Sequence, residues 1–470
     1  MLNFIRKIWS LGAGQILLKA SNLWVFWYLA DIGGAATLGL IVLGAALLKY
    51  TTLVSDLGWN ITSLIESTRD NSKSKSAELY SYKLVWSIPV IGIVSALIFA
   101  FTDAGMMRQI AFWYVMSSFF DVLFPDWYFQ AKQKFHYINQ VRISAQIVFV
   151  ALIFTQVHSG EDFHLVSFFY FISHVGMLPL MIWAASRVGF GGYHPKYLFQ
   201  SFSHGFNTRF KKWFHQSFHI GMSQVFLSVS LHYGALILGL VAENNLTGNF
   251  GFALKILGAA MIVDQIIHLF LLSGLQSKFK ESYSYLQLAT FFSYITWLGT
   301  LLVVALPIDF IYHFIAPEFK NLASDFRVLS LFLPLTIFHS FVQTWIFHQF
   351  TGYKIFKVSL YSAIAPFVIM TTTALQDPES MPQAMILSEF LLVTFLSYFA
   401  FDKQFKAISV WLFTLGPISL YLVNQFNQYS WSSKIVLPII IISLISIFHP
   451  LRPTLPQTKP LLKRWKKLNK

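Results

Sequence analysis

Two lysines stand near the middle of long apolar segments at the start of the chain. Lys19 lies in IWSLGAGQILLKASNLWVFWYLA, and Lys49 lies in LGLIVLGAALLKYTTLVSDLGWN. At about 1.5 Å of rise per residue, each ammonium group is more than about 15 Å from either end of its segment, too far for a lysine side chain to reach the interface comfortably. Because a charge is costly in lipid, we expect both lysines to face an interior and to attract an anionic ligand. The alternative is a structural pair between each lysine and a nearby acid.

Other polar side chains share the helix faces of these lysines. Gln15, Lys19 and Asn22 are spaced i, i+4, i+7, and Asp56 follows Lys49 by seven residues. On an α-helix these spacings place each group on one face of an otherwise apolar cylinder. We therefore predict that Gln15, Lys19, Asn22 and Lys49 line a central cavity that binds an anionic group.

A third lysine and several acids also lie within apolar segments. Lys255 stands about six residues inside its segment, so its ammonium group could line the cavity or extend to the outer surface. Asp264 and Glu389 are candidates for H⁺ or Na⁺ coupling, because a carboxyl group inside a bilayer can bind and release a cation. Asp56 and Asp126 stand near the inner ends of their segments, where they could hold or cap a cytoplasmic gate.

The composition is that of an integral membrane protein. Of 470 residues, 56% are hydrophobic and only 11% are charged, whereas about 25% of residues are charged in a typical soluble protein. Apolar stretches of about 20 residues recur along the chain, which predicts helices rather than the shorter alternating strands of a barrel. The chain has no cysteine, which excludes disulfides and thiolate metal sites.

The breaks between apolar stretches predict fourteen membrane-spanning helices. The expected spans are 8–30, 37–60, 84–102, 108–129, 138–157, 164–186, 217–241, 249–274, 286–306, 327–350, 356–375, 383–401, 407–424 and 435–449. Most of the 34 Lys and Arg residues, with Arg142 counted among them, then fall on the side that holds both termini, which the positive-inside rule identifies as the cytoplasm. The formal net charge of +14 therefore reflects topology, and we expect no nucleic-acid partner.

The spans divide into two lobes. The stretch WYFQAKQKFHYINQVRISA from Trp127 aligns without gaps with WIFHQFTGYKIFKVSLYSA from Trp345, which indicates two six-helix repeats of the same orientation. The predicted organisation is a first lobe at 1–186, a cytoplasmic linker at 187–216 that could form an amphipathic helix, a second lobe at 217–401, two extra helices at 402–450 and a basic cytoplasmic tail at 451–470.

Catalytic motifs are missing from the sequence. It contains no Gly-rich phosphate loop, no HExxH and no GxSxG, and its histidines and acids lack metal-ligand spacing. Histidines within the spans, such as His339, are interpreted as structural, because imidazole commonly hydrogen-bonds between helices. We therefore predict a transporter rather than an enzyme, with no metal site and no cofactor other than H⁺ or Na⁺ for coupling.

A resemblance to a known family rests on two stretches and on the two-lobe arrangement. DWYFQAKQKFHYINQVRI at 126–143 and GFALKILGAAMIVDQ at 251–265 resemble the polysaccharide transporters of the multidrug/oligosaccharidyl-lipid/polysaccharide (MOP) exporter superfamily, and most closely the bacterial O-antigen flippases. The best-matched positions are Asp126, Trp127, Phe129, Gln130, Tyr137 and Ile138. The resemblance implies a MATE-like exporter fold with two six-helix lobes and two C-terminal helices.

The resemblance also implies a function. It implies transport of an undecaprenyl-diphosphate-linked oligosaccharide, such as an O-antigen unit, between the leaflets of the bacterial cytoplasmic (inner) membrane by rocking of two lobes. In relatives that flip a lipid-linked peptidoglycan precursor, basic residues in the first, second and eighth spans line the cavity, and Lys19, Lys49 and Lys255 occupy those spans here. The expected partners are this glycan lipid, membrane lipid and other polysaccharide-assembly proteins.

Two other functions compete with this interpretation. In a multidrug exporter of the same fold, acids in the cavity would attract a cationic drug, whereas central lysines repel it. A membrane-embedded polymerase or glycosyltransferase would need a large outer loop, whereas the longest expected outer segment, 307–326, has only about 20 residues.

Overall fold

The computed structural model describes residues 2–70, 72–196, 208–261, 296, 322–349 and 352–401. These residues form helices joined by short turns and loops, and no strand occurs among them. In this part of the chain seven helices are long and apolar enough to cross a membrane, or up to eight if one bent pair counts as a span. The predicted all-α membrane fold is confirmed. The total of fourteen helices stays a prediction, because the expected spans 407–424 and 435–449, and the span 286–306 apart from Thr296, lie outside the described residues.

The first lobe runs from α1 to α8. Its elements are α1 (Leu2–Asp56), α2 (Trp59–Arg69), α3 (Lys73–Phe101), α4 (Met106–Leu123), α5 (Asp126–Ala131), α6 (Phe135–Gln156), η1 (Gly160–Asp162), α7 (Phe163–Val175), α8 (Leu178–Val188) and η2 (Gly191–Tyr193). α1 contains the first two predicted spans as two arms, because the chain turns at Gly34, whose φ of 67° and ψ of −179° suit glycine alone. The Tyr28 hydroxyl donates a 2.7 Å hydrogen bond to the Val157 carbonyl and ties the first arm to the end of α6.

The described part of the second lobe begins with α10. Its elements are α10 (Thr208–Leu227), η3 (Val229–Tyr233), α11 (Gly234–Val241), α12 (Asn244–Ala260), α16 (Leu322–Ser330), α17 (Phe332–Gln349), α18 (Gly352–Gln376), η5 (Pro378–Ser380) and α19 (Met381–Phe401). α10 includes residues 208–216, so the end of the predicted linker is the start of this helix. The π-helical turn η3 lies at a 53° bend between α10 and α11.

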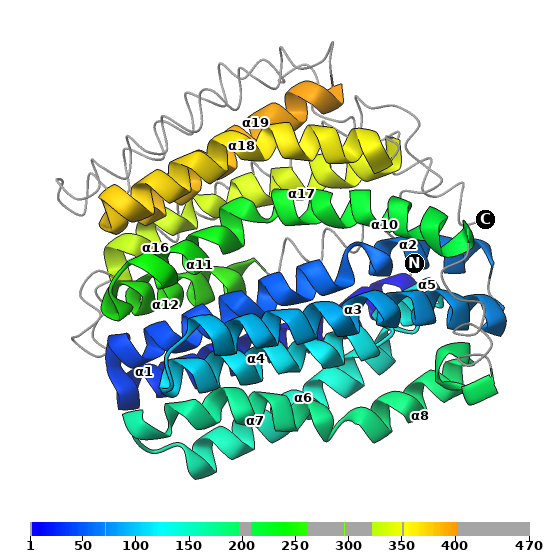
Figure 1. Ribbon diagram of the computed structural model, residues 1–470, viewed down its shortest axis with the longest axis horizontal. Coiled ribbons are helices and arrows are strands. Elements are labelled where there is room, and N and C mark those ends of the chain that lie inside the picture. Colours follow the sequence, from blue (N-terminus) through cyan, green and yellow to red (C-terminus); the bar gives the residue numbers. More distant parts are fainter. Residues whose placement is uncertain are drawn as a thin grey trace.

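The two lobes form two layers (Figure 1), with α1 to α8 in blue to green-cyan and α10 to α19 in green to orange. The second arm of α1 is a main contact between the layers. Leu38 of this arm shares one apolar core with Leu238 of α11 and Phe250 of α12. The helices approach so closely that a Cβ on Gly248 would overlap the carbonyl group of Ala35.

A second contact joins the lobes at the end of the molecule where the N-terminus, α2 and α5 lie together (Figure 1). There the Ser217 hydroxyl in α10 donates a 3.0 Å hydrogen bond to the Thr62 hydroxyl in α2. A Cβ on Gly58 would lie 2.6 Å from the amide nitrogen of Gly221. We call this contact, formed by Gly58, Thr62, Ser217 and Gly221, the α2–α10 seal.

Candidate functional site

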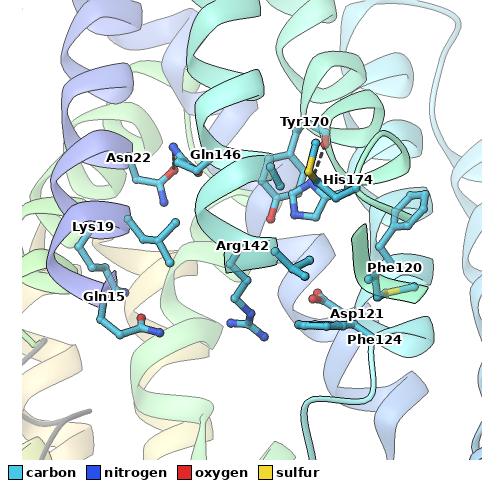
Figure 2. Close-up of a pocket in the computed structure, with 15 residues that line it drawn as sticks. Gln15, Lys19, Asn22, Phe120, Asp121, Phe124, Arg142, Gln146, Tyr170 and His174 are labelled. Carbon is cyan, nitrogen blue, oxygen red and sulfur yellow. Dashed lines mark hydrogen bonds between the residues drawn. The ribbon is translucent and has the colours of Figure 1, made fainter. Parts of the chain in front are cut away.

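A cavity of about 290 Å³ lies inside the first lobe, between α1, α4, α6, α7 and α8. Its charged and amide side chains are Gln15, Lys19, Asn22, Asp121, Arg142 and Gln146 (Figure 2). The three residues of the predicted stripe on α1 therefore face the same cavity. The Gln146 side chain donates a 3.2 Å hydrogen bond to the Asn22 amide oxygen, which fixes the orientation of both amide groups. Tyr170 and His174 of α7 complete the polar part of the wall.

Arg142 gives this cavity a second cation that the sequence analysis missed. The positive-inside pattern puts it with the basic residues on the cytoplasmic side, whereas the structure places it inside α6, where it lines the cavity and pairs with Asp126. Its side chain is 43% exposed, so that part of the guanidinium group can receive a ligand. The sequence signal is the i, i+4 spacing of Arg142 and Gln146, which puts both on one face of α6.

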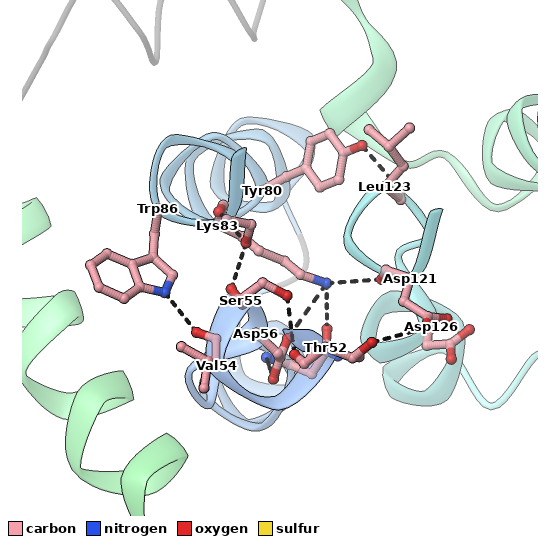
Figure 3. Close-up of polar contacts among 12 residues, drawn as sticks. Thr52, Val54, Ser55, Asp56, Tyr80, Lys83, Trp86, Asp121, Leu123 and Asp126 are labelled. Carbon is pink, nitrogen blue, oxygen red and sulfur yellow. Dashed lines mark hydrogen bonds and ion pairs between the residues drawn. The ribbon is translucent and has the colours of Figure 1, made fainter. Parts of the chain in front are cut away.

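The two predicted gate acids each form an ion pair at the α2 end of the molecule. Asp126, at the start of α5, pairs with Arg142, and the Asp56 carboxylate lies 3.5 Å from the Lys83 ammonium group. Lys83 is 1% exposed and donates a 2.9 Å hydrogen bond to the Asn60 side-chain oxygen. Figure 3 shows this ammonium group reaching from α3 toward the junction of α1 and α2. Asp56 and Asp126 thus belong to a charge network next to the cavity.

Lys49 and Lys255 approach the region from the boundary between the lobes. Lys49, on the second arm of α1, has an exposed side chain and lies within electrostatic range of Asp121 and Arg142. Lys255 extends from α12 over the ring of Phe26 in α1, with its nitrogen 4.3 Å from the ring centre. This cation–π contact places Lys255 beside α1. Neither Lys49 nor Lys255 is part of the wall of the 290 Å³ cavity, in contrast to the expectation that they line it.

The three lysines share one electrostatic environment. Lys19, Lys49 and Lys255 each lie close enough to His232 for their charges to act on its ring. His232 belongs to η3, the π-helical turn of the second lobe. Like charges that are held together in a region of low dielectric repel one another, and an anion between them relieves this repulsion. The arrangement therefore favours an anionic ligand over a cationic one.

A second polar cluster lies in the second lobe around Glu389. This residue of α19 is 1% exposed, and its carboxylate accepts hydrogen bonds from Ser230 of η3 and from the His339 ring of α17, the latter at 2.8 Å. π-Helical turns are frequent at functional sites. Among the described residues no group of three His, Asp or Glu side chains could hold a metal ion. The other predicted coupling residue, Asp264, lies outside the described residues.

Two acids outside the spans have shifted pKa values. Hydrogen bonds from the His158 backbone N–H and the Ser159 hydroxyl lower the pKa of Asp162 in the loop before α7. Burial raises the pKa of Asp325 in α16 to about 7, and the negative charge of Glu379 in η5 adds to this effect. Asp325 therefore titrates near neutral pH.

The comparisons with known proteins fit this geometry. A family model described as "Polysaccharide biosynthesis protein" matches residues 4–269, which is more than half of the chain. The chain belongs to this family. The match to the polysaccharide biosynthesis family includes the whole cavity wall, Lys49 and Lys255. No curated protein is significantly similar to the chain in sequence.

Solved structures show the fold of this family member. The eukaryotic MATE transporter AtDTX14 has a TM-score of 0.54 and 12% identity, over 90% of this chain and 99% of that chain. An inward-facing multidrug resistance MATE transporter of the MOP superfamily has a TM-score of 0.52 and 12% identity, over 82% and 95% of the two chains. An outward-facing multidrug resistance MATE transporter of the MOP superfamily has a TM-score of 0.51 and 14% identity. The match covers 90% of this chain and 97% of that chain. The chain is therefore a multi-pass membrane protein with a MATE-like fold.

Proposed function

We propose that the protein is a flippase that moves an undecaprenyl-diphosphate-linked oligosaccharide, an O-antigen or other surface polysaccharide unit, across the bacterial inner membrane. The observation that carries this proposal is the cavity lined by Lys19 and Arg142 in a member of a polysaccharide biosynthesis family with a transporter fold. A diphosphate is the part of such a lipid that two cations would bind. The positive-inside pattern supports an orientation in which both termini and the α2–α10 seal face the cytoplasm.

The two cations of the cavity have complementary roles in this proposal. The Arg142 guanidinium is a planar fork that can hold two oxygens of one phosphate group, whereas the Lys19 ammonium acts as a point charge. The amides of Gln15, Asn22 and Gln146 offer donors and acceptors for sugar hydroxyls beside the phosphates. Recognition thus depends on charge for the diphosphate and on hydrogen bonds for the first part of the glycan.

Lys49 and Lys255 extend the positive region toward the boundary between the lobes. A head group that leaves the cavity would meet these lysines as the lobes rock, while the lipid tail stays in the bilayer. Binding of the diphosphate offsets the repulsion among Lys19, Lys49 and Lys255, so that the lobes can move with the anion between them. Alternating access then exposes the head group to the other leaflet.

We propose the Glu389 cluster as the coupling site, with H⁺ as the ion. A carboxyl group inside a bilayer can bind and release a cation, and the buried Glu389 is held by hydrogen bonds from η3 and α17. Sodium requires several oxygen ligands, and the hydrogen bonds around Glu389 come from one hydroxyl and one imidazole. No other cofactor is proposed.

The flippase proposal is tested with purified protein in lipid vesicles. A fluorescent oligosaccharide linked to a polyprenyl diphosphate should move between leaflets faster than in protein-free vesicles, whereas the same oligosaccharide on a zwitterionic phospholipid should not. Uptake of a cationic dye without movement of the diphosphate lipid would support the multidrug exporter instead. Elongation of the glycan during the assay would support a polymerase.

A further inference from the structure

We propose that Arg142, Asp126 and Lys83 form a charge relay that links binding of an anion in the cavity to release of the α2–α10 seal. This inference rests on the proposed function, because the anion is the diphosphate of the substrate. Arg142 touches the substrate, whereas Asp126 and Lys83 are positioning residues that act through it.

The first step is competition for Arg142. In the structure its guanidinium both lines the cavity and pairs with Asp126. The other carboxylate oxygen of Asp126 is buried and has no hydrogen-bond partner, so the charge of this acid depends on Arg142 for compensation. A phosphate group in the cavity competes for the same guanidinium. Asp126 is then left as a partly buried charge without its nearest cation, which is destabilising.

The second step is a shift of Lys83. Among the described residues, Lys83 is a second cation, after Arg142, that is close enough to Asp126 to interact with its charge, and its side chain is buried. It is held by the Asn60 side-chain oxygen at 2.9 Å, the Asp121 carbonyl at 3.4 Å and the Asp56 carboxylate at 3.5 Å (Figure 3). When Asp126 loses Arg142, attraction to the free carboxylate draws Lys83 away from Asn60 and Asp56.

The third step reaches the seal through the junction of α1 and α2. Asp56 ends α1, and its carboxylate also accepts a 3.4 Å hydrogen bond from the Asn60 backbone N–H. Leu57 and Gly58 connect the two helices with φ values of 43° and 79°, so the junction is a tight turn that needs outside support. Gly58 and, one turn later, Thr62 are the α2 side of the seal. Loss of the Lys83 contacts therefore loosens the seal.

Such a linkage is reciprocal. If a diphosphate in the cavity favours an open seal, an open seal must increase the affinity for diphosphate by the same factor. A purely structural Arg142–Asp126 pair predicts no effect of diphosphate on the seal, although loss of the Asp126 charge would still strengthen anion binding by removing a repulsion. The response of the seal to the anion separates the two cases.

The absence of native cysteine permits a direct test. Thr62 is 0% exposed, so Thr62→Cys reports on the seal through its reaction with N-ethylmaleimide. Thr68→Cys, at an exposed position of α2, is the matched control for reagent access. Farnesyl diphosphate is the probe. It should accelerate labelling of Cys at position 62 several-fold and leave position 68 unchanged.

The variant Asp126→Asn then removes the carboxylate charge that pairs with Arg142. Because the competitor for Arg142 is gone, this variant should bind farnesyl diphosphate about tenfold more tightly, and labelling at position 62 should no longer respond to the probe. Asp126→Glu should restore the response. Lys83→Gln is a second variant that leaves the Arg142–Asp126 pair in place. It should abolish the labelling response and weaken the binding of farnesyl diphosphate, because no cation then compensates Asp126 when the diphosphate takes Arg142.

The possible failures are distinct. Lower or unchanged affinity in Asp126→Asn, with labelling that still responds to farnesyl diphosphate, would overturn the relay and leave the flippase proposal intact. The relay is also overturned if farnesyl diphosphate accelerates labelling at position 62 in Lys83→Gln as much as in the protein with Lys83. No binding of farnesyl diphosphate by the wild-type protein would instead contradict the proposed function, and the relay with it.

Discussion

The hydroxyl of Ser217 donates a 3.0 Å hydrogen bond to the hydroxyl of Thr62, 155 residues earlier in the chain, and both side chains are 0% exposed. This bond joins α10 of the second lobe to α2 of the first. The opposite end of the molecule is joined by the close approach of Gly248 to Ala35. Any motion that opens the α2 end must break the Ser217–Thr62 contact, so this pair reports directly on the movement of the lobes.

A disulfide at this contact should stop transport. The double variant Thr62→Cys/Ser217→Cys places two thiols where the hydroxyls now meet, and no other cysteine competes. Oxidation should abolish lipid movement in vesicles, and reduction should restore it. Each single variant is the control and should be insensitive to oxidant. Undiminished transport by the oxidised double variant would show that the α2–α10 seal does not open during the cycle.

Alanine at Gly58 should weaken the closed state. Its φ of 79° costs a residue with a Cβ about 1–2 kcal/mol, and the new methyl group would press on the backbone of Ser217 and Gly221. We expect Gly58→Ala to lower the melting temperature measured in detergent. Gly92→Ala is the matched control, since Gly92 lies in α3 with no atom within 4 Å of its added Cβ. An unchanged melting temperature for Gly58→Ala would remove this argument for a tightly packed seal.

Glu389→Gln should uncouple transport from the proton gradient. The amide keeps the size of the side chain and can hydrogen-bond with Ser230 and His339, but it cannot exchange a proton. Lipid movement driven by an imposed pH gradient should fall to the rate without a gradient, whereas exchange at equal pH should continue. Glu161→Gln, at an exposed loop acid, serves as the control. Full response of Glu389→Gln to the gradient would assign coupling to another residue.

Asp325 should make stability depend on pH. Its pKa of about 7 in the folded protein lies above the ordinary aspartate value, which is about 3.9 in an unfolded chain. The folded state therefore binds the proton more tightly, and the contribution of Asp325 to stability is complete below about pH 4, declines as pH rises and is lost above about pH 7.

The check is thermal unfolding in detergent from pH 4 to 8. Asp325→Asn should flatten this part of the profile and raise the melting temperature at pH 8 by a few degrees. Asp103→Asn, which changes an exposed acid in the loop after α3, should leave the slope unchanged. A wild-type slope in the Asp325→Asn protein would assign the pH dependence to other groups.

Local spacing predicted which side chains share one face of α1, but it did not predict that Lys49, expected to line the same cavity, lies outside its wall. Gln15, Lys19 and Asn22 repeat at the helical period, and the period alone decides which face of a helix they share. The apolar stretches predicted the membrane helices for a similar reason, because length and hydropathy are properties of one segment.

Pairings between distant segments could not be predicted in this way. Ser230 and Glu389 are 159 residues apart, and their contact depends on a π-helical turn that no local pattern indicates. The positive-inside pattern puts Arg142 with the basic residues of the cytoplasmic side. Its role follows only from the position of Asp126 and of the cavity.

The central claim is that Lys19 and Arg142 bind the diphosphate of the substrate. It is tested by the rate at which Lys19→Ala/Arg142→Ala protein moves a fluorescent polyprenyl-diphosphate-linked oligosaccharide between vesicle leaflets. Because a hydrogen bond to a charged group contributes about 1.5–3 kcal/mol, loss of both cations should slow transport by at least about 100-fold. Lys134→Ala/Lys211→Ala, which removes two exposed surface charges, should retain the wild-type rate. Wild-type transport by folded Lys19→Ala/Arg142→Ala protein would contradict the account.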